Sequence, residues 1–441
     1  MRRKPRPGGG KQVEVTIESL GGRGDGIAQL GADLGTRPVF VPGTVPGDRV
    51  RLRLTGERGG AYRGAVIELL EAGPGRVEPP CPYFGPCGGC ALQHWEAARY
   101  ADWKAGLLGQ ALARRGLSDV TIRPLVQIPP GTRRRAVLAA RCGPGNRIVL
   151  GFHERAGHDV VDIESCLLLT PALLALLPAL RALLGSLLPA GARAQATLIE
   201  SEMGIDLLLQ LPALPDLQAR EALAAFAEQE DLARLSCCDA EGTTEPIAMR
   251  RPPQVTFGGV AVVPPPGGFL QPSAAGEAAL TEALLAYLPE EASPVADLYA
   301  GCGTFSFAIA AQGAPQGQRK VHAVEADAAS LSALCQAARV GDLASRVSGE
   351  ERDLERRPLA PEELKDYAAV IFDPPRAGAK AQAEAIARSS VPLAVAISCN
   401  PNSFARDART LVDGGFTLVE ATPIDQFPWS GHLELVALFR R

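Results

Sequence analysis

A cysteine at the end of an apolar stretch is the residue of this sequence best suited to nucleophilic chemistry. Val395–Ser398 has β-strand character, and Cys399 follows it directly before Asn400-Pro401, which breaks the strand. In open α/β sheets, ligands bind and react at the carboxyl ends of the strands. A cysteine in such a place is also often an inert, small apolar residue. Whether Cys399 is a nucleophile therefore depends on the motifs around it.

Two carboxylates lie at the ends of other predicted strands. Asp373 begins the sequence Asp-Pro-Pro-Arg after the apolar run Ala369–Phe372, so it would line the mouth of a pocket at the strand end. Glu434 is the only acid in the last predicted strand, Gly431–Phe439. A carboxylate is costly in a half-buried strand unless it is paired or functional. Glu434 is therefore a candidate functional residue.

A glycine turn and an acid predict a nucleoside-binding site. The strand Val295–Tyr299 leads into Gly301 and Gly303, which let the backbone turn tightly and approach a ligand. Glu325 ends the next strand, 22 residues after Gly303, where an acid binds a ribose hydroxyl pair. Ser306 replaces the third glycine of the dinucleotide fingerprint, which argues against a pyrophosphate and favours S-adenosylmethionine.

Three cysteines in one Gly/Pro-rich loop predict a metal site. Cys81, Cys87 and Cys90 have the spacing C-x5-C-x2-C, and Cys166 is the candidate fourth ligand. The N-terminus has no apolar signal core, so we expect a cytoplasmic protein whose cysteines bind metal or react rather than form disulfides. The spacing leaves zinc and an iron–sulfur cluster both open, and Cys237-Cys238 has no evident role.

The pattern of predicted elements gives the fold class. From Phe269 onward strands and helices alternate, which predicts a Rossmann-like, doubly wound α/β sheet. Short alternating strands between residues 11 and 72 predict an OB-like β-barrel, and a β-rich section follows residue 122. The predicted domains are a disordered basic tail (1–10), the barrel (11–74), a central domain with the cysteine loop (75–92 and 122–265) and the α/β domain from residue 266 to 441.

The distribution of charge favours a polyanionic partner. Residues 1–72 hold 12 Lys and Arg against 8 Asp and Glu, although the whole chain has a net charge of −4. Arg49, Arg51 and Arg53 alternate along one strand face, and Thr132–Arg135 begins a second basic area suited to phosphate contacts. Both patterns are equally typical of solvated charged faces.

A leucine-rich run does not predict a membrane span. Pro171, Pro178 and Arg181 interrupt Cys166–Leu188, which leaves less than the roughly 18–20 apolar residues that a span requires. The run predicts a pair of buried helices. Nothing in the sequence indicates an obligate protein partner, so a monomer is expected.

Several motifs together resemble the RNA uracil-5-methyltransferases, the family of the bacterial tRNA and 23S rRNA enzymes, over essentially the whole chain. Residues 11–72 are also similar to the TRAM domain, an RNA-binding barrel. The motifs occur in the family's order and are Phe269-Leu-Gln271-Pro-Ser273, Gly301-Cys-Gly303, Asp373-Pro-Pro-Arg-Ala-Gly378, Ser398-Cys-Asn400 and His432-Leu-Glu434. Departures from the family pattern are Ser273 and Thr304 in place of Asn, Ala396 in place of Tyr and Ser403 in place of Thr.

This resemblance implies a reaction, a substrate and two cofactors. It also implies that 93–121 and 266–441 together form a methyltransferase domain, and that 75–92 and 122–265 form a domain that binds a metal cluster and RNA. Cys399 would add to C6 of uracil, C5 would accept the methyl group, and Glu434 would remove the C5 proton. The implied substrate is a uridine of RNA, with 23S rRNA favoured over tRNA; RNA cytosine-5 methylation and a non-catalytic RNA-binding protein are the further alternatives. The implied ligands are Gln271, Tyr299, Glu325 and Asp373 for S-adenosylmethionine, and Cys81, Cys87, Cys90 and Cys166 for a [4Fe-4S] cluster.

Overall fold

The computed structural model describes residues 10–31, 34–289, 293–312 and 318–441. The predicted basic tail therefore falls almost wholly outside the described residues. The chain divides into two compact units. Unit 1 holds the residues up to Lys104 together with Glu154–Gly157 and Trp429–His432, and unit 2 holds the rest.

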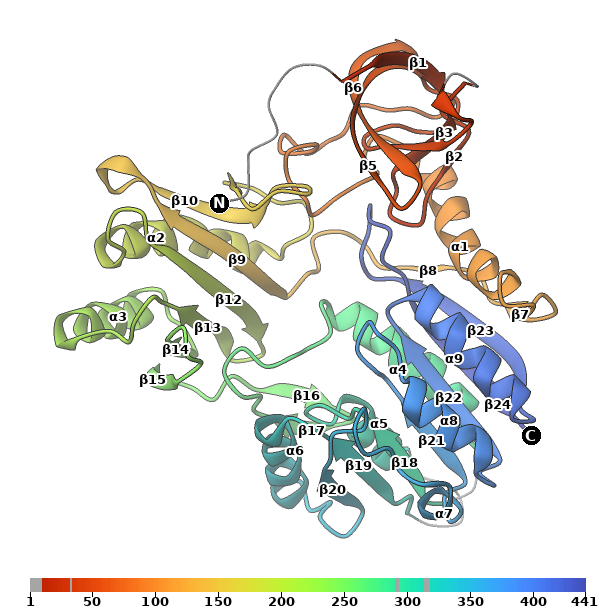
Figure 1. Ribbon diagram of the computed structural model, residues 1–441. Coiled ribbons are helices and arrows are strands. Elements are labelled where there is room, and N and C mark those ends of the chain that lie inside the picture. Colours follow the sequence, from red (N-terminus) through yellow and green to blue (C-terminus); the bar gives the residue numbers. More distant parts are fainter. Residues whose placement is uncertain (1–9, 32–33, 290–292, 313–317) are drawn as a thin grey trace. The chain divides into compact units, whose positions relative to one another are not determined.

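Unit 1 contains the predicted barrel (red to orange in Figure 1). Its strands alternate buried apolar with exposed residues, so one face encloses a core that includes Val15, Val39 and Leu52. The strand order is β1-β5-β6-β4-β3-β2. The bounds are β1 (Gln12–Thr16), β2 (Ser19–Leu20), β3 (Gly26–Gln29), β4 (Pro38–Val41), β5 (Arg49–Arg58) and β6 (Ala61–Glu71).

The first sheet of unit 2 is the β-rich central section. It has the order β11-β10-β9-β12-β13-β14-β15, with helices α2 (Pro171–Leu187) and α3 (Leu217–Gln229) packed on it. The strands are β9 (Arg135–Cys142), β10 (Ile148–His153), β11 (Val160–Asp162), β12 (Arg193–Ser201), β13 (Gly204–Gln210), β14 (Arg234–Cys238) and β15 (Thr244–Met249). A hairpin of β16 (Val255–Phe257) and β17 (Val260–Val262) follows.

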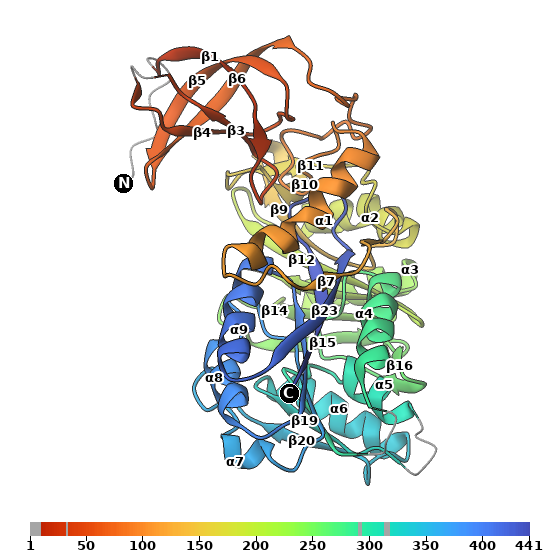
Figure 2. The same cartoon turned by 90° about the vertical axis from the view of Figure 1, so that its right-hand side faces the viewer.

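The second sheet of unit 2, here called the C-terminal sheet, confirms the doubly wound prediction. Its order is β20-β19-β18-β21-β22-β24-β23-β7, and β8 also pairs with β23. Viewed edge-on in Figure 2, it has α8 and α9 on one side and α4, α5 and α6 on the other. The strands are β7 (Thr121–Ile122), β8 (Val126–Gln127), β18 (Val295–Leu298), β19 (Val321–Glu325), β20 (Val347–Glu351), β21 (Ala369–Phe372), β22 (Leu393–Ser398), β23 (Thr417–Asp425) and β24 (Glu434–Arg440).

Each helix of this region lies between two successive strands of the chain. Ser273, Asp327 and Asn400 each cap a helix with a side-chain oxygen that accepts a backbone N–H, as expected for these residue types. The bounds are α4 (Ala274–Tyr287), α5 (Thr304–Ala311), α6 (Ala328–Val340), α7 (Pro361–Leu364), α8 (Lys380–Arg388) and α9 (Pro401–Asp413).

One local prediction was wrong. The leucine-rich run forms the single helix α2, not a pair, because Pro178 lies inside it while leucines such as Leu173, Leu180 and Leu184 keep one continuous buried face. Helix α1 comprises Ala97–Ala113. Among the described residues, no helix is long and apolar enough to cross a membrane.

Candidate active site

The strand register brings distant acids to one edge of the C-terminal sheet. Asp297 on β18 is in register with residues of both β19 and β21. Two residues further along these strands lie Tyr299, Glu325 and Asp373. Because side chains alternate across a strand, Glu325 and Asp373 share the face of Asp297 at the carboxyl edge of the sheet, whereas the left-handed backbone at Tyr299 ends the alternation there.

The antiparallel pairing of β22 with β24 brings Cys399 to Glu434. Ser398 of β22 is opposite Leu435 of β24 as the last pair of the ladder. One step further in the same register sets Cys399 opposite Glu434, on the same face of the sheet. Directly opposed residues of antiparallel strands have Cβ atoms roughly 4.5–5.5 Å apart. A thiol and a nearly buried carboxylate are thus neighbours.

The electrostatics of this edge confirm that these groups are close. Burial, then the charges of Glu434 and Asp373, raise the pKa of Cys399 to about 11, and Arg376 acts in the opposite direction. Burial, then Glu434 and Asp297, raise the pKa of Asp373 well above its usual value. A cation placed among these groups would favour their ionised forms. In the ligand-free protein the thiol form of Cys399 is therefore strongly favoured.

The glycine turn after β18 meets the acid that ends β19. Tyr299 has a φ of +64°, and Gly301 and Gly303 have φ of +55° and +92°. The N–H of Gly301 donates to Oε2 of Glu325 at 2.8 Å, and Oε1 of Glu325 accepts the N–H groups of Ala326 and Asp327. Gly301 and Glu325, which the sequence assigned to one nucleoside-binding site, are therefore hydrogen-bonded to each other. The three N–H donors hold the Glu325 carboxylate in one orientation.

Asp297 is a buried acid that the sequence interpretation did not single out. Ser306 Oγ donates to its Oδ2 at 2.5 Å, and its Oδ1 accepts from no described residue. Burial, chiefly, raises the pKa of Asp297 to about 7. An acid inside the apolar run of residues 295–298 was the available signal.

Helix α9 holds the loop that follows Asp373. The carbonyl oxygen of Arg376 accepts hydrogen bonds from Asn400 Nδ2 and Ser403 Oγ, both at 3.1 Å. The buried carboxylate of Asp407 accepts the N–H of Ala379 at 2.8 Å, and the adjacent Arg406 donates to Ala377 O at 2.9 Å. Hydrogen bonds thus connect the segment after Cys399 to the loop after Asp373.

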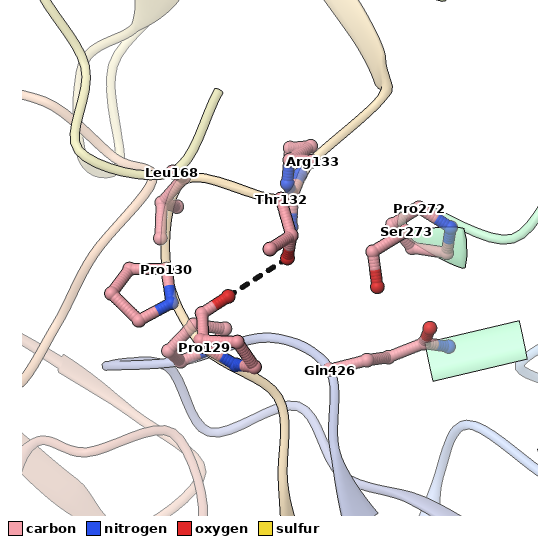
Figure 3. Close-up of a pocket in the computed structure, with 9 residues that line it drawn as sticks. Pro129, Pro130, Thr132, Arg133, Leu168, Pro272, Ser273 and Gln426 are labelled. Atoms are coloured by element: carbon pink, nitrogen blue, oxygen red, sulfur yellow. Dashed lines mark hydrogen bonds between the residues drawn. The ribbon is translucent and has the colours of Figure 1, made fainter. Parts of the chain in front are cut away.

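Gln271 lies on a segment that two other elements hold in place. Arg134 donates from Nε to Gln271 O at 3.3 Å and pairs with Glu277 at 2.6 Å. Gln426 Nε2 donates to Gln271 Oε1 at 2.8 Å. Beside this pair is a small pocket, which Ser273 and Gln426 line together with Thr132 and Arg133 (Figure 3). Gln426 was not anticipated from the sequence, and Arg134 was expected to contact phosphate rather than this segment.

Most arginines of the two predicted basic areas bind acids or carbonyl oxygens of the protein itself. On the barrel, Arg49 and Arg51 form ion pairs with Glu14, Glu68 and Glu71. In the second area, Arg134 pairs with an acid, and Arg135 donates to the carbonyl oxygens of residues 267 and 268. These side chains hold the protein's own elements, so the expected phosphate-binding role is not supported for them.

The cysteine loop has the donor chemistry of a metal site without its geometry. Cys81, Cys87 and Cys90 lie in unit 1 and are partly exposed, Cys166 belongs to unit 2, and none forms a disulfide. The N–H of Gly89 donates to Cys87 Sγ at 3.5 Å, an interaction common around ligating sulfurs. Within the described part of the chain, however, no group of three or more His, Cys, Asp or Glu is arranged to hold a metal ion.

Comparisons with known proteins agree with this architecture. Residues 264–441 match the family model described as tRNA (Uracil-5-)-methyltransferase, and residues 9–66 match the TRAM domain model. The crystal structure of Pyrococcus abyssi tRNA (uracil-54, C5)-methyltransferase with S-adenosyl-L-homocysteine has a TM-score of 0.73 at 21% identity. It covers 97% of this chain and 100% of that chain, which shows a shared fold.

Curated relatives extend over almost the full length. A protein of Brucella suis named as an uncharacterized RNA methyltransferase is 44% identical over 434 residues, which is 98% of each chain. The 23S rRNA (uracil(1939)-C(5))-methyltransferase RlmD of Chromohalobacter salexigens is 33% identical over 97% of this chain and 89% of that protein. The chain therefore belongs to the family of S-adenosylmethionine-dependent RNA uracil-5-methyltransferases.

Proposed function

We propose that this protein methylates C5 of one uridine in RNA, with 23S rRNA as the favoured substrate, through a covalent bond to Cys399. The observation that carries the proposal is the β22–β24 register, in which the position of Cys399 falls opposite Glu434. The 33% identity to a 23S rRNA enzyme favours rRNA. A tRNA substrate is the alternative, since the family model and the similar crystal structure are named for tRNA enzymes.

The reaction requires a nucleophile, a methyl donor and a base. The thiolate of Cys399 forms a bond to C6 of uracil, and the C5–C6 double bond becomes an enolate. C5 of the enolate then takes the methyl group that S-adenosylmethionine supplies when it is bound. Glu434 removes the remaining hydrogen of C5 as a proton, the double bond re-forms, and the C6–S bond breaks to release the thiolate. The target base must be unstacked to reach the sheet edge.

The site residues have separate roles in this proposal. Gln271, Tyr299, Glu325 and Asp373 hold S-adenosylmethionine, with Gly301 and Gly303 letting the backbone approach it. The fixed carboxylate of Glu325 and the position of Asp373 on the same face of the sheet support this assignment.

The test is methylation of 23S rRNA and tRNA transcripts by the purified protein, with 5-methyluridine mapped by mass spectrometry. We expect one modified uridine in the 23S transcript and none with Cys399→Ala. RNA carrying 5-fluorouridine at that position should form an adduct that survives denaturation, because fluorine cannot leave as a proton does. An equal adduct with Cys399→Ser would exclude Cys399 as the nucleophile, and 5-methylcytidine as the product would favour the cytosine alternative.

We further propose that Cys81, Cys87, Cys90 and Cys166 hold a [4Fe-4S] cluster. Four thiols and the absence of disulfides suit this assignment. Anaerobically purified protein should be brown and contain about four irons per chain. Stoichiometric zinc in a colourless protein would refute the cluster.

The remaining expectations concern the protein's surroundings. We propose a cytoplasmic monomer with RNA as its macromolecular partner. Light scattering coupled to size-exclusion chromatography should give a mass near 46.2 kDa, and a dimer mass would contradict the proposal.

A further inference from the structure

Gln271 and Gln426 form an isolated amide pair beside the candidate active site. They are 155 residues apart in sequence, and only 5% and 3% of their surfaces are exposed. Gln426 Nε2 donates to Gln271 Oε1 at 2.8 Å. Gln426 comes directly after β23, on which Ile424 is opposite Glu434. The pair therefore connects the surroundings of the candidate base to the segment that carries Gln271.

This hydrogen bond decides which end of the Gln271 amide remains available. An amide offers one acceptor oxygen and one donor nitrogen. Since Gln271 Oε1 already accepts from Gln426, and Gln271 Nε2 donates to no described residue, the available end is the donor. The backbone from which the Gln271 side chain extends is held in place, because Arg134 donates to the carbonyl oxygens of both Gln271 and Pro272.

We propose that Gln426 is a positioning residue that makes Gln271 present its NH₂ group, and not its oxygen, to an acceptor oxygen of the bound S-adenosylmethionine. The inference rests on the proposed function through the assignment of Gln271 to the cofactor. It adds the chemistry of the contact: the group that faces Gln271 is a carboxylate or hydroxyl oxygen.

A glycine beside the pair shows how closely Gln426 is fitted. A Cβ added to Gly276 on α4 would lie 2.3 Å from Gln426 Oε1 and 3.0 Å from Ser273 Oγ. Gly276 is helical, so alanine would suit its backbone. The absence of a side chain therefore leaves room for the Gln426 amide, and Gly276→Ala would displace it without changing any hydrogen-bonding group.

The experiment measures binding of S-adenosylhomocysteine to the full chain by calorimetry. Gln426→Met should weaken binding about five- to tenfold, the cost of one misdirected hydrogen bond. Gly276→Ala should weaken it similarly. In a Gln271→Met background, which lacks the amide to be oriented, Gln426→Met should have no further effect. In turnover assays Gln426→Met should raise KM for S-adenosylmethionine by the same factor and leave kcat nearly unchanged.

Two matched controls separate positioning from general loss of packing. Gln382→Leu removes another fully buried glutamine, whose amide bonds only to Leu359. Gly185→Ala adds a methyl group to a helical glycine whose nearest neighbour is 3.7 Å away. Both should retain the parent affinity, whatever their effect on Tm.

The outcomes distinguish this inference from the proposed function. If the parent protein binds S-adenosylhomocysteine and methylates RNA while Gln426→Met binds equally well, the positioning role is wrong and the function stands. Additive effects in the double variant would also refute the positioning role. If the parent protein neither binds S-adenosylhomocysteine nor methylates RNA, the proposed function itself fails.

Discussion

Glu434 begins strand β24 next to the end of β22, where Cys399 follows, and its charge is one reason why the pKa of the Cys399 thiol is raised. In the ligand-free protein, the charge of the candidate base Glu434 disfavours the thiolate form in which Cys399 would act as a nucleophile. A positive charge among Cys399, Glu434 and Asp373 would reverse this effect, because a cation stabilises the thiolate and both carboxylates. The site is therefore electrostatically suited to a cationic methyl donor.

The pH dependence of Cys399 reactivity follows from this arrangement. Its pKa of about 11 means that the thiolate fraction, and with it the rate of alkylation by iodoacetamide, should rise about tenfold per pH unit across pH 7–10. Peptide mass spectrometry of Cys399 after timed alkylation measures this rate. Arg376→Gln should slow alkylation at every pH in that range, since Arg376 lowers the pKa. A plateau below pH 8 in the parent protein would contradict the expected raised value.

Removal of the base should trap the intermediate. Glu434→Gln keeps the shape of the side chain but cannot take the C5 proton, so turnover should fall about 10²–10⁴-fold while the RNA stays bound through sulfur. A denaturing gel with labelled RNA should show this adduct with unmodified uridine, which needs no fluorine. Unchanged turnover would assign the proton transfer to another group.

The hydrogen bonds between α9 and the loop after Asp373 should contribute to both the stability of the fold and the rate of methylation. Asp407→Ala leaves the Ala379 N–H without its acceptor and Arg406 without its carboxylate partner, which should cost about 1–3 kcal/mol and lower kcat. Thermal unfolding and initial rates measure the two effects. Asp413→Ala is the control, because Asp413 forms an exposed ion pair with Arg409 on the same helix. Equal losses in both variants would show that the contact to the loop is unimportant.

The buried Asp297 should make the protein less stable as the pH rises. Its pKa is raised from its ordinary value to about 7 in the folded protein, so the folded state binds the extra proton between about pH 4 and 7. Stability from this group is therefore full at low pH and is lost as the pH increases through 7. Asp297→Asn should remove that part of the slope, which denaturant unfolding at pH 5, 6, 7 and 8 would show. A slope identical to that of the parent protein would contradict the raised pKa.

The sequence predicted the fold where periodicity and order were enough. Alternation of strands and helices after Phe269 predicted the doubly wound sheet, and the family motifs predicted the family, both of which are confirmed. Cys399, Glu434 and Asp373 could be expected at one edge because strand ends meet there. Their mutual effects on pKa could not be expected, because burial depends on the packing of the whole sheet.

Features that depend on distant neighbours were not predictable from local pattern. Arg49 and Arg51 alternate as a basic strand face should, but Glu14 on the adjacent strand β1 neutralises part of that charge. Only the β1–β5 register makes Glu14 their neighbour. Gln426 gave no signal, since its partner Gln271 lies 155 residues away. Pro178 predicts a helix end, yet α2 continues through it. Packing of the buried leucines outweighs the backbone hydrogen bond that proline cannot donate.

The pairing of β7 and β8 with β23 has a consequence for biosynthesis. Arg123, between the two short strands, bonds to Glu420, 297 residues later in the chain. On the ribosome these strands emerge long before their partner exists, so the outer edge of the C-terminal sheet can close only at the end of translation. A gene fragment that starts at residue 266 would encode β23 with that edge bare, and its product should be prone to edge-to-edge aggregation.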